Sequence, residues 1–426
     1  MEGKVTLSQR EQKRAAVLIE VDKGVMTGKQ AAEVMGISVR HAKRLLAAYR
    51  KEGIAAMAHG NRGRKPPNAL GEEIREKVLE LAGTKYTGFN HQHFTEKLVE
   101  NEGIALSRSS VRNILLKAGI RSPRKRRAPK HRSRRERYPK AGMLLQTDGS
   151  PHDWLEGRGP KLCLIGAIDD ATGKVPYAHF QEHENSQGYF RMLQEITRKH
   201  GIPLALYHDR HSIFEVTTDV LPSLEEQLEG KILMTQLGRL MDELGITSIS
   251  AHSPQAKGRI ERLWGTFQDR LTSELRLSGA RTIEEANQRL SHFLSEYNRK
   301  FGIDAREAGS AYRELPAGFK PDEVFCFKYQ RVAGADNVVS FYGQRMQILP
   351  SEERVSYARC KVEVHYRLDD SLAVYYQGRR LDTVPAPFEP ARLRAPVLAG
   401  TTAQRHYAKP APDHPWRGIF RQFVDR

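Results

Sequence analysis

Residues 257–275, KGRIERLWGTFQDRLTSEL, predict one long helix with an acidic residue, Glu261, near its start. Upstream lie apolar segments typical of strands: MLLQTDG (143–149), KLCLIGAIDDATGKVPYAHF (161–180), PLALYHD (203–209) and ITSISAH (246–252). The second of these is expected to be a hairpin that turns at DDATG. Amphipathic helices are expected between the strands, at 186–201 and 236–246. This order of strands and helices predicts an α/β layered domain.

Three acidic residues stand where this pattern would gather them. Asp148 and Asp209 each end an apolar strand, and Glu261 begins the long helix. If the two strands are neighbours, the aspartates meet at one edge of the sheet. Three carboxylates in one place repel each other, and a divalent cation resolves the repulsion. Taken singly, each acid has an ordinary alternative reading, as a turn residue, a helix cap or a surface ion pair.

The residues around these acids resemble a known family. The segments QTDGSPHDWL (146–155), LYHDRHSIF (206–214) and AHSPQAKGRIERLWGTFQDRL (251–271) resemble the three catalytic blocks of the retroviral-integrase superfamily. They are most similar to those of the DDE-type bacterial insertion-sequence transposases. YNRKF (297–301) is similar to the Tyr–Asn segment that follows the family's core. The resemblance covers about residues 140–315.

The resemblance implies an RNase H-like core and a metal-dependent reaction. In this reading Asp148, Asp209 and Glu261 are both the catalytic residues and the metal ligands. The expected cofactor is Mg²⁺, replaceable by Mn²⁺, with two ions about 4 Å apart clamping a phosphodiester. Water would free a 3′-hydroxyl at the end of a mobile element, and that hydroxyl would attack target DNA. The implied partners are double-stranded DNA, as the terminal inverted repeats and the target, and further copies of the chain on paired ends.

One departure concerns the interval from Asp209 to Glu261, which is longer than in well-known members of the family. The extra residues are expected in EVTTDVLPSLEEQLEGK (215–231), as a surface insertion. Glu215 and Asp219 are therefore fallback candidates for the second aspartate. The remaining nearby acids are expected to be turn residues or exposed: Asp153, Asp169 and Asp170.

A formal net charge of +18 and a pI of about 9.8 favour a polyanionic partner, although a merely soluble basic protein is the alternative. GKQAAEVMGISVRHAKRLLAAYR (28–50) predicts a helix-turn-helix that turns at Gly36, with Ser38 capping the second helix. Its apolar face is expected at Ala31, Ala32, Val34, Met35, Val39, Ala42, Leu45 and Leu46. A second such module, capped by Ser107, is expected within 70–120. Two packed helices with a solvated basic face are the alternative reading.

The DNA-binding candidates are the basic side chains of these helices, of the linker and of the long helix's start. They are Arg40, Lys43, Arg44, Arg108, Arg112, Arg124, Lys125, Arg126, Arg127, Lys257 and Arg259. Ordinary solvated charge is the alternative for Lys257 and Arg259. Trp264 and Phe267 are expected in the core rather than as base-stacking platforms.

The predicted fold is multidomain: helix-turn-helix modules, an α/β RNase H-like core and a small all-β barrel. The expected divisions are 1–60 and 70–120 (helix-turn-helix), 61–69 (linker), 121–140 (basic linker), 141–315 (catalytic core), 320–395 (barrel) and 396–426 (Pro-rich tail). Helix is expected to continue over 281–315, with Leu290, Phe293, Leu294 and Tyr297 in the core.

The cysteines, Cys163, Cys326 and Cys360, are far apart, which argues against a zinc finger and fits a reducing compartment. His91 and His93 are expected to be ordinary polar residues. No apolar run is long enough to span a bilayer, so the expected location is the cytoplasm of a prokaryotic cell, at the nucleoid. The rival functions are a DNA-binding regulator on a decayed core and a nuclease that cuts without joining. A GxxxxGK[ST] motif for an ATP-dependent role is absent.

Overall fold

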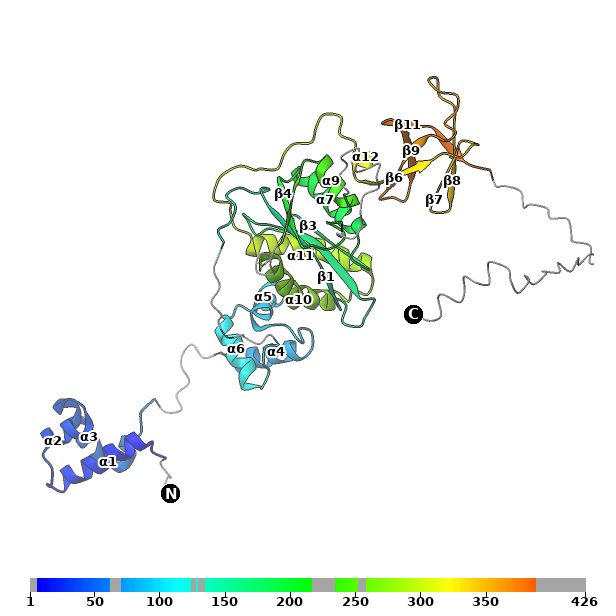
Figure 1. Cartoon of the computed structure of the whole chain (residues 1–426). Coiled ribbons are helices and arrows are strands. Elements are labelled where there is room, and N and C mark those ends of the chain that lie inside the picture. The colour runs from blue at the N-terminus through cyan, green and yellow to red at the C-terminus, as the bar shows by residue number, and fades with distance from the viewer. Residues whose placement is uncertain are drawn as a thin grey trace, which may run out of the picture. The chain divides into compact units, whose positions relative to one another are not determined.

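The computed structural model describes residues 6–61, 70–123, 128, 135–216, 234–251 and 258–387. The chain forms two compact units, one of residues 1–132 and 266–279 and the other of residues 133–265 and 280–426 (Figure 1). Several sequence predictions lie outside the described residues: most of the 61–69 linker, most of the 215–231 insertion, Lys257 and the tail after 395. So do the basic residues Arg124, Lys125, Arg126 and Arg127.

The first unit opens with three helices, α1 (Gln9–Asp22), α2 (Gly28–Met35) and α3 (Val39–Glu52), followed by a 3₁₀ turn at Gly53–Met57. Gly36 ends α2 in the left-handed conformation (φ 63°), and the Ser38 hydroxyl accepts the His41 backbone N–H, so both turn signals are confirmed.

The expected apolar face of this helix-turn-helix is right only in part. Ala31, Ala32 and Ala42 are buried, and Met35, Leu45 and Leu46 pack against the small core of Ala15, Leu18 and Met57. Val34 is 63% exposed and Val39 is 41% exposed, so their assignment to the core was wrong. The small core is covered by one side of each short helix, and these two valines lie on the other side.

A second group of helices follows in the same unit: α4 (Glu72–Gly83), α5 (His91–Glu102) and α6 (Arg108–Lys117). Ser107 caps α6 by accepting the Ser110 backbone N–H, as expected. The core of this group is apolar and aromatic: Val78, Tyr86, Phe89, Phe94, Leu98, Val111 and Leu115.

The second half of α10 (Gly258–Ser278) belongs to this unit and is joined to α5 by charged groups. His93 Nε2 lies 2.6 Å from Glu274 Oε1, and Lys97 Nζ lies 2.9 Å from the same oxygen. All three side chains are buried. His93 is therefore part of a buried ionic cluster rather than the ordinary polar residue that the sequence predicted.

The second unit contains a five-stranded sheet in the order β3-β2-β1-β4-β5. Its strands are β1 (Leu145–His152), β2 (Leu162–Asp169), β3 (Tyr177–Gln181), β4 (Ala205–His208) and β5 (Thr247–Ser250). β1, β2 and β3 are antiparallel, whereas β4 runs parallel to β1 and to β5. The expected hairpin at 161–180 and the α/β pattern are thus confirmed.

Alternate residues of the strands face opposite sides of this sheet. One side, with Leu145, Cys163 and Ile165, forms a core with α7 (Ser186–His200) and α9 (Gln236–Glu243). The other side meets the first turns of α10, where Trp264 approaches Gly166. This arrangement places β1 in the middle of the sheet, between the two layers of helices (Figure 1).

Helix α11 (Ile283–Phe301) buries Leu290, Phe293 and Tyr297, while Leu294 is half-buried. The helix ends at Phe301, so the expected continuation to 315 was wrong. After Gly302 the chain is irregular because its backbone groups bond to other segments. The N–H groups of Ile303, Ala311 and Arg313 donate to the carbonyls of Thr172, Ala141 and Ile202, respectively.

The C-terminal strands form two sheets. After α12 (Pro321–Val324), one sheet contains β6 (Cys326–Val332), β9 (Lys361–Arg367), β10 (Leu372–Tyr376) and β11 (Arg379–Leu381). The other contains β7 (Val338–Phe341), β8 (Gln344–Ile348) and β12 (Thr383–Pro385).

These strands share one apolar core but, over the described residues 326–385, they do not close into the barrel that the sequence predicted. Phe327 of β6 instead stacks on Phe190 of α7, with ring centroids 4.5 Å apart. The start of β6 therefore packs against the α/β core. Within the described ranges, none of the helices combines the length and apolar character needed to cross a membrane.

Candidate functional site

Asp148 lies in the middle of β1, opposite Gly166 of β2, so the prediction that it ends the strand was wrong: pairing with β2 continues to His152. Its Oδ2 accepts a hydrogen bond from the indole N–H of Trp264, on α10, at 3.2 Å. Trp264 is 6% exposed, so it belongs to the core as expected. Its polar edge also fixes the orientation of the Asp148 carboxylate, a role that the sequence did not reveal.

Asp209 directly follows β4. The parallel register pairs Leu145 with Leu206 and Gln146 with Tyr207, an offset of 61 residues. Continued beyond the paired residues, the same offset would bring Asp209 opposite Asp148. Laterally paired residues of neighbouring strands face the same side of a sheet. The strands that carry the two aspartates are therefore neighbours, as the sequence predicted, and the close approach of the aspartates themselves stays a prediction.

His208 holds the chain next to Asp209. It is fully buried, and its Nδ1 lies 2.6 Å from the Asp209 carbonyl oxygen. Its Nε2 lies 2.7 Å from the Ser248 hydroxyl of β5, and its ring stacks on Phe214 at 4.1 Å. A carbonyl only accepts, so Nδ1 carries the proton and Nε2 accepts from Ser248.

Glu261 lies in the first turn of α10 and its side chain is exposed. The Ile260 backbone N–H donates to Gln146 Oε1 of β1 at 3.4 Å, so this turn is joined to the central strand. Glu261 precedes Trp264 by three residues and shares its side of the helix. Across the described ranges, no three His, Cys, Asp or Glu side chains are gathered closely enough to hold a metal ion.

Negative charge is concentrated around the two aspartates. Burial raises the pKa of Tyr189 far above its usual value, and the carboxylates of Glu184, Asp148 and Asp209 raise it further. Burial, with the charges of Glu184 and Asp148, raises the pKa of Cys163 to about 12. Glu184 is thus a neighbour of the site that the sequence reasoning missed. It lies in the loop after β3 together with the exposed Glu182, so its position after a strand would not have singled it out in the sequence.

The other acids near the first block have structural roles. Asp170 is fully buried and accepts hydrogen bonds from Arg135, Arg259 and the Tyr138 backbone. Asp169 is also buried, as part of the turn after β2, and accepts the Gly142 and Thr172 N–H groups. Both are turn residues, as expected, but they are also buried anchors.

The fallback candidates and Asp153 are placed differently. The Ser250 hydroxyl bonds to Glu215, on the other side of β4 from β1. Asp219 lies outside the described residues. Asp153 is half-buried rather than exposed, and accepts the Gly157 N–H at 3.1 Å.

The basic candidates on the two amino-terminal groups of helices are exposed. Arg40, Lys43 and Arg44 lie on α3, and Arg108 and Arg112 lie on α6. Arg259 differs from them, because its guanidinium lies 2.7 Å from Asp170 and its side chain is only 17% exposed. Its contact with DNA phosphate remains a prediction, as do those of the other basic candidates.

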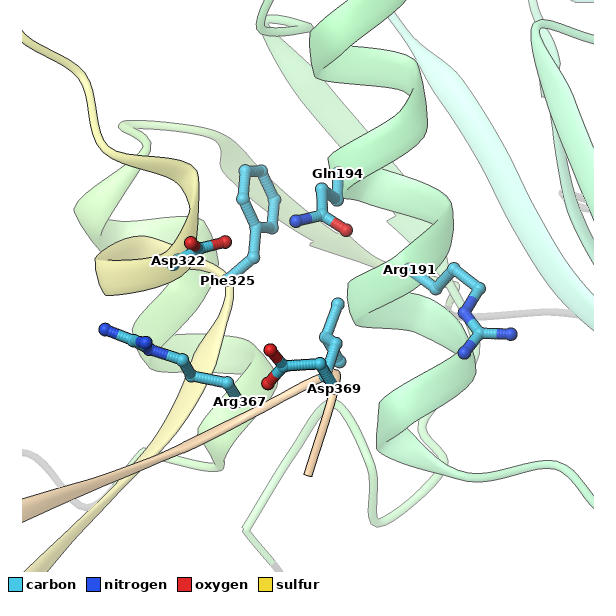
Figure 2. A pocket seen from close by; sticks show the side chains of 7 residues that line it. Arg191, Gln194, Asp322, Phe325, Arg367 and Asp369 are labelled. Atoms are coloured by element: carbon cyan, nitrogen blue, oxygen red, sulfur yellow. The ribbon is translucent and has the colours of Figure 1, made fainter. Parts of the chain in front are cut away.

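Two pockets lie away from these carboxylates. One, of about 240 Å³, is lined by Arg191 and Gln194 of α7 and by Asp322, Arg367 and Asp369 of the C-terminal part (Figure 2). The other, of about 460 Å³, lies between β3, α7 and α11. Neither of these two pockets is lined by Asp148, Asp209 or Glu261.

Comparison with known proteins gives the family. The winged helix-turn-helix family model matches residues 14–76. The chain is 36% identical over 384 residues to the protein named "Putative transposase y4bF" of Sinorhizobium fredii, with 89% of this chain and 81% of the relative covered. It is 32% identical over 380 residues to the transposase for insertion sequence IS1202 of Streptococcus pneumoniae, with 80% of this chain and 78% of the relative covered.

Similar solved structures are retroviral. One is a simian T-cell lymphotropic virus intasome in complex with PP2A regulatory subunit B56 gamma (TM-score 0.30, 14% identity, 73% of this chain and 100% of that chain). Another is the HTLV-2 integrase catalytic core domain in complex with magnesium (TM-score 0.26, 17% identity, 38% of this chain and 89% of that chain).

The helix-turn-helix match and the transposase relatives indicate a protein that binds DNA and acts in DNA transposition. The identity to these relatives extends over most of the chain and most of their own length. The chain belongs to the family of insertion-sequence transposases.

Proposed function

We propose that this transposase cleaves the 3′ ends of its own element and joins them to target DNA, with Asp148, Asp209 and Glu261 as the catalytic carboxylates. The observation that supports the proposal is the parallel pairing of β1 with β4, whose register, if continued, would set Asp209 opposite Asp148. The docking of the first turn of α10 on β1, through Gln146 and Trp264, supports Glu261 as the third member.

The donor set fits a hard divalent cation such as Mg²⁺, with Mn²⁺ as a substitute, and two ions are proposed. All the proposed ligands are carboxylate oxygens, the donors that Mg²⁺ prefers. The aspartates lie among like charges, since Glu184, Asp148 and Asp209 all act on Tyr189. When bound, the metal would supply Lewis-acid activation of the phosphodiester.

The chain's own residues have the task of holding this set in place. Trp264 orients Asp148 by a hydrogen bond, and His208 fixes the backbone at Asp209. Glu261 is presented from an exposed helical turn, where a DNA phosphate and solvent can reach it. Pre-orientation of this kind reduces the entropy that binding and reaction would otherwise cost.

The DNA partners in this proposal are the terminal inverted repeats and the target duplex. The modules at 1–60 and 70–120 would hold the repeats, with the 141–315 region supplying the chemistry and the 320–395 region flanking it. Exposed arginine and lysine side chains on α3 and α6 support phosphate contacts there. Because two ends must be cut and joined together, the active species is proposed to be a homo-oligomer.

The test is cleavage and strand transfer on a labelled element-end duplex with Mg²⁺. Wild type is compared with Asp148→Asn, Asp209→Asn and Glu261→Gln, each checked for DNA binding. The proposal expects wild type to cut and join, and all three variants to bind DNA without doing either. Full activity in Asp209→Asn alone would reassign the second aspartate. A wild type that binds but cuts with neither Mg²⁺ nor Mn²⁺ would favour a DNA-binding regulator.

A further inference from the structure

A layer of side chains lies behind the two aspartates, on the α7 side of the sheet. Asp148 faces α10, so its neighbour Gly149 faces the opposite side, toward α7. The Glu184 carboxyl occupies the space beside Gly149, because a Cβ atom added there would overlap its Cδ and both oxygens. Glu184 therefore packs directly against the backbone that carries Asp148.

Glu184 is fixed in this position by a buried hydroxyl. Tyr189 Oη donates to Glu184 Oε1 at 2.5 Å, and Tyr189 is 1% exposed. A buried tyrosine hydroxyl needs a hydrogen-bond partner, and a carboxylate acceptor gives a short, strong bond. The Glu184 carboxylate therefore has a defined place rather than the freedom of a surface side chain.

The same layer continues to the second aspartate. The Tyr189 ring meets Phe214 edge-on, with centroids 4.9 Å apart. Phe214 in turn stacks on His208, which bonds to the Asp209 carbonyl. One row of contacts, Glu184–Tyr189–Phe214–His208, thus runs behind both aspartates. The Glu184 carboxylate, at the start of this row, adds a negative charge close to Asp148.

We propose that Glu184, anchored by Tyr189, is a positioning residue that sets Asp148 for binding a divalent cation. This inference rests on the proposed function of Asp148 and Asp209. Glu184 acts from behind the strand, through the Gly149 backbone and through its charge, and it is not itself assigned as a ligand. Groups that orient metal ligands change metal affinity about 10- to 100-fold when they are removed.

The central test compares Glu184→Gln with Glu182→Gln in the full-length protein. The first substitution would keep the size of the side chain and a hydrogen-bond acceptor but remove the charge. Glu182 lies on the same loop, is exposed and serves as the matched control. Two quantities are measured: the affinity for Mn²⁺ by calorimetry without DNA, and the Mg²⁺ concentration that gives half-maximal cleavage.

The expected result is about a 10-fold weaker Mn²⁺ affinity and a similar rise in half-saturating Mg²⁺ for Glu184→Gln. Cleavage at saturating Mg²⁺, the melting temperature and DNA binding should stay near wild type. Tyr189→Phe should shift the metal dependence in the same direction, because it releases the carboxylate while keeping its charge. Glu182→Gln should change nothing.

Gly149→Ala provides an independent way to displace the Glu184 carboxyl without deleting it. The effects of Gly149→Ala and Glu184→Gln on Mn²⁺ affinity should be non-additive, because both substitutions act through the same contact. The inference is overturned if Glu184→Gln matches Glu182→Gln in Mn²⁺ affinity and in half-saturating Mg²⁺. That outcome leaves the proposed function intact, whereas a wild type that neither binds Mn²⁺ nor cleaves removes both.

Discussion

Asn298 of α11 bonds to both backbone groups of Val175: its Oδ1 accepts the N–H at 2.7 Å and its Nδ2 donates to the carbonyl at 2.9 Å. Asn287 does the same for Phe180, at 2.7 and 3.0 Å. Eleven helical residues rise about 16.5 Å, and five strand residues span about the same length. The two amides therefore act as a substitute strand along the edge of β3.

Replacing Asn298 with leucine should destabilise the second unit. The buried N–H and carbonyl of Val175 would each lose their partner, at a cost of about 1–3 kcal/mol per group. We expect a lower urea midpoint for Asn298→Leu and also for Asn287→Leu. Ser295→Ala, on the exposed side of the same helix, is the control. A midpoint equal to that of the control would show that the edge does not depend on this pairing.

His179 should make stability depend on pH. Burial lowers its pKa to about 4, with Arg191 acting in the same direction and Gln181 opposing. Because the ordinary pKa is about 6.5, the unfolded chain binds the proton first as the pH falls. Stability is therefore complete above about pH 6.5 and declines toward pH 4, by about 3 kcal/mol.

The measurement is the unfolding free energy of wild type and His179→Gln between pH 7.5 and 4. The difference between the two proteins isolates this histidine from other titrating groups. The difference in unfolding free energy between wild type and His179→Gln should change steadily as the pH falls below 6.5. A constant difference over that range would contradict the prediction.

The exposed basic residues of α3 should dominate the salt dependence of DNA binding. Each phosphate contact contributes about −0.9 to the slope of log K against log salt concentration. Replacing Arg40, Lys43 and Arg44 by alanine should therefore reduce the slope by up to about 2.7. Arg50→Ala is the control, since Arg50 already pairs with Asp22 at 2.8 Å. An unchanged slope in the triple variant would place the phosphate contacts elsewhere.

His208→Phe should slow cleavage without weakening DNA binding. Phenylalanine keeps the stacking on Phe214 but loses the bonds to the Asp209 carbonyl and to Ser248. A small misplacement of a catalytic group can cost about 100-fold in rate. Single-turnover cleavage at saturating Mg²⁺ measures the effect, with Tyr207→Phe as the neighbouring control. Wild-type rates in His208→Phe would mean that Asp209 is held by other contacts.

The sequence predicted the α/β pattern of strands and helices, because this pattern depends on local signals. Apolar segments next to an acidic residue can be recognised in the sequence, although only Asp209 follows the end of its strand, whereas Asp148 lies within β1. The helix caps at Ser38 and Ser107 were also predicted correctly, since each cap involves only two residues that are three positions apart in the sequence. Such features need no knowledge of distant contacts.

What could not be predicted depends on residues that are remote in sequence. Trp264 bonds to Asp148 across 116 residues, and Asn298 to Val175 across 123. The end of α11 at Phe301 was missed because the following backbone is satisfied by partners such as Thr172. The prediction of a closed barrel was wrong for a similar reason. The spacing of strands along the sequence does not determine which strands pair with each other.

The buried ionic cluster around Glu274 has a consequence for dividing the protein into fragments. A fragment ending at residue 132 would keep His93 and Lys97 but lose Glu274, which lies 2.6 and 2.9 Å from them. It would also lose Leu277, which packs on the core of this helical group. Lys97 would keep its ion pair with Glu100 at 3.3 Å but would lose the fully buried partner Glu274, and breaking such a buried ion pair is costly. A fragment that is to keep these helices intact should therefore also include residues 266–279, which belong to the same compact unit.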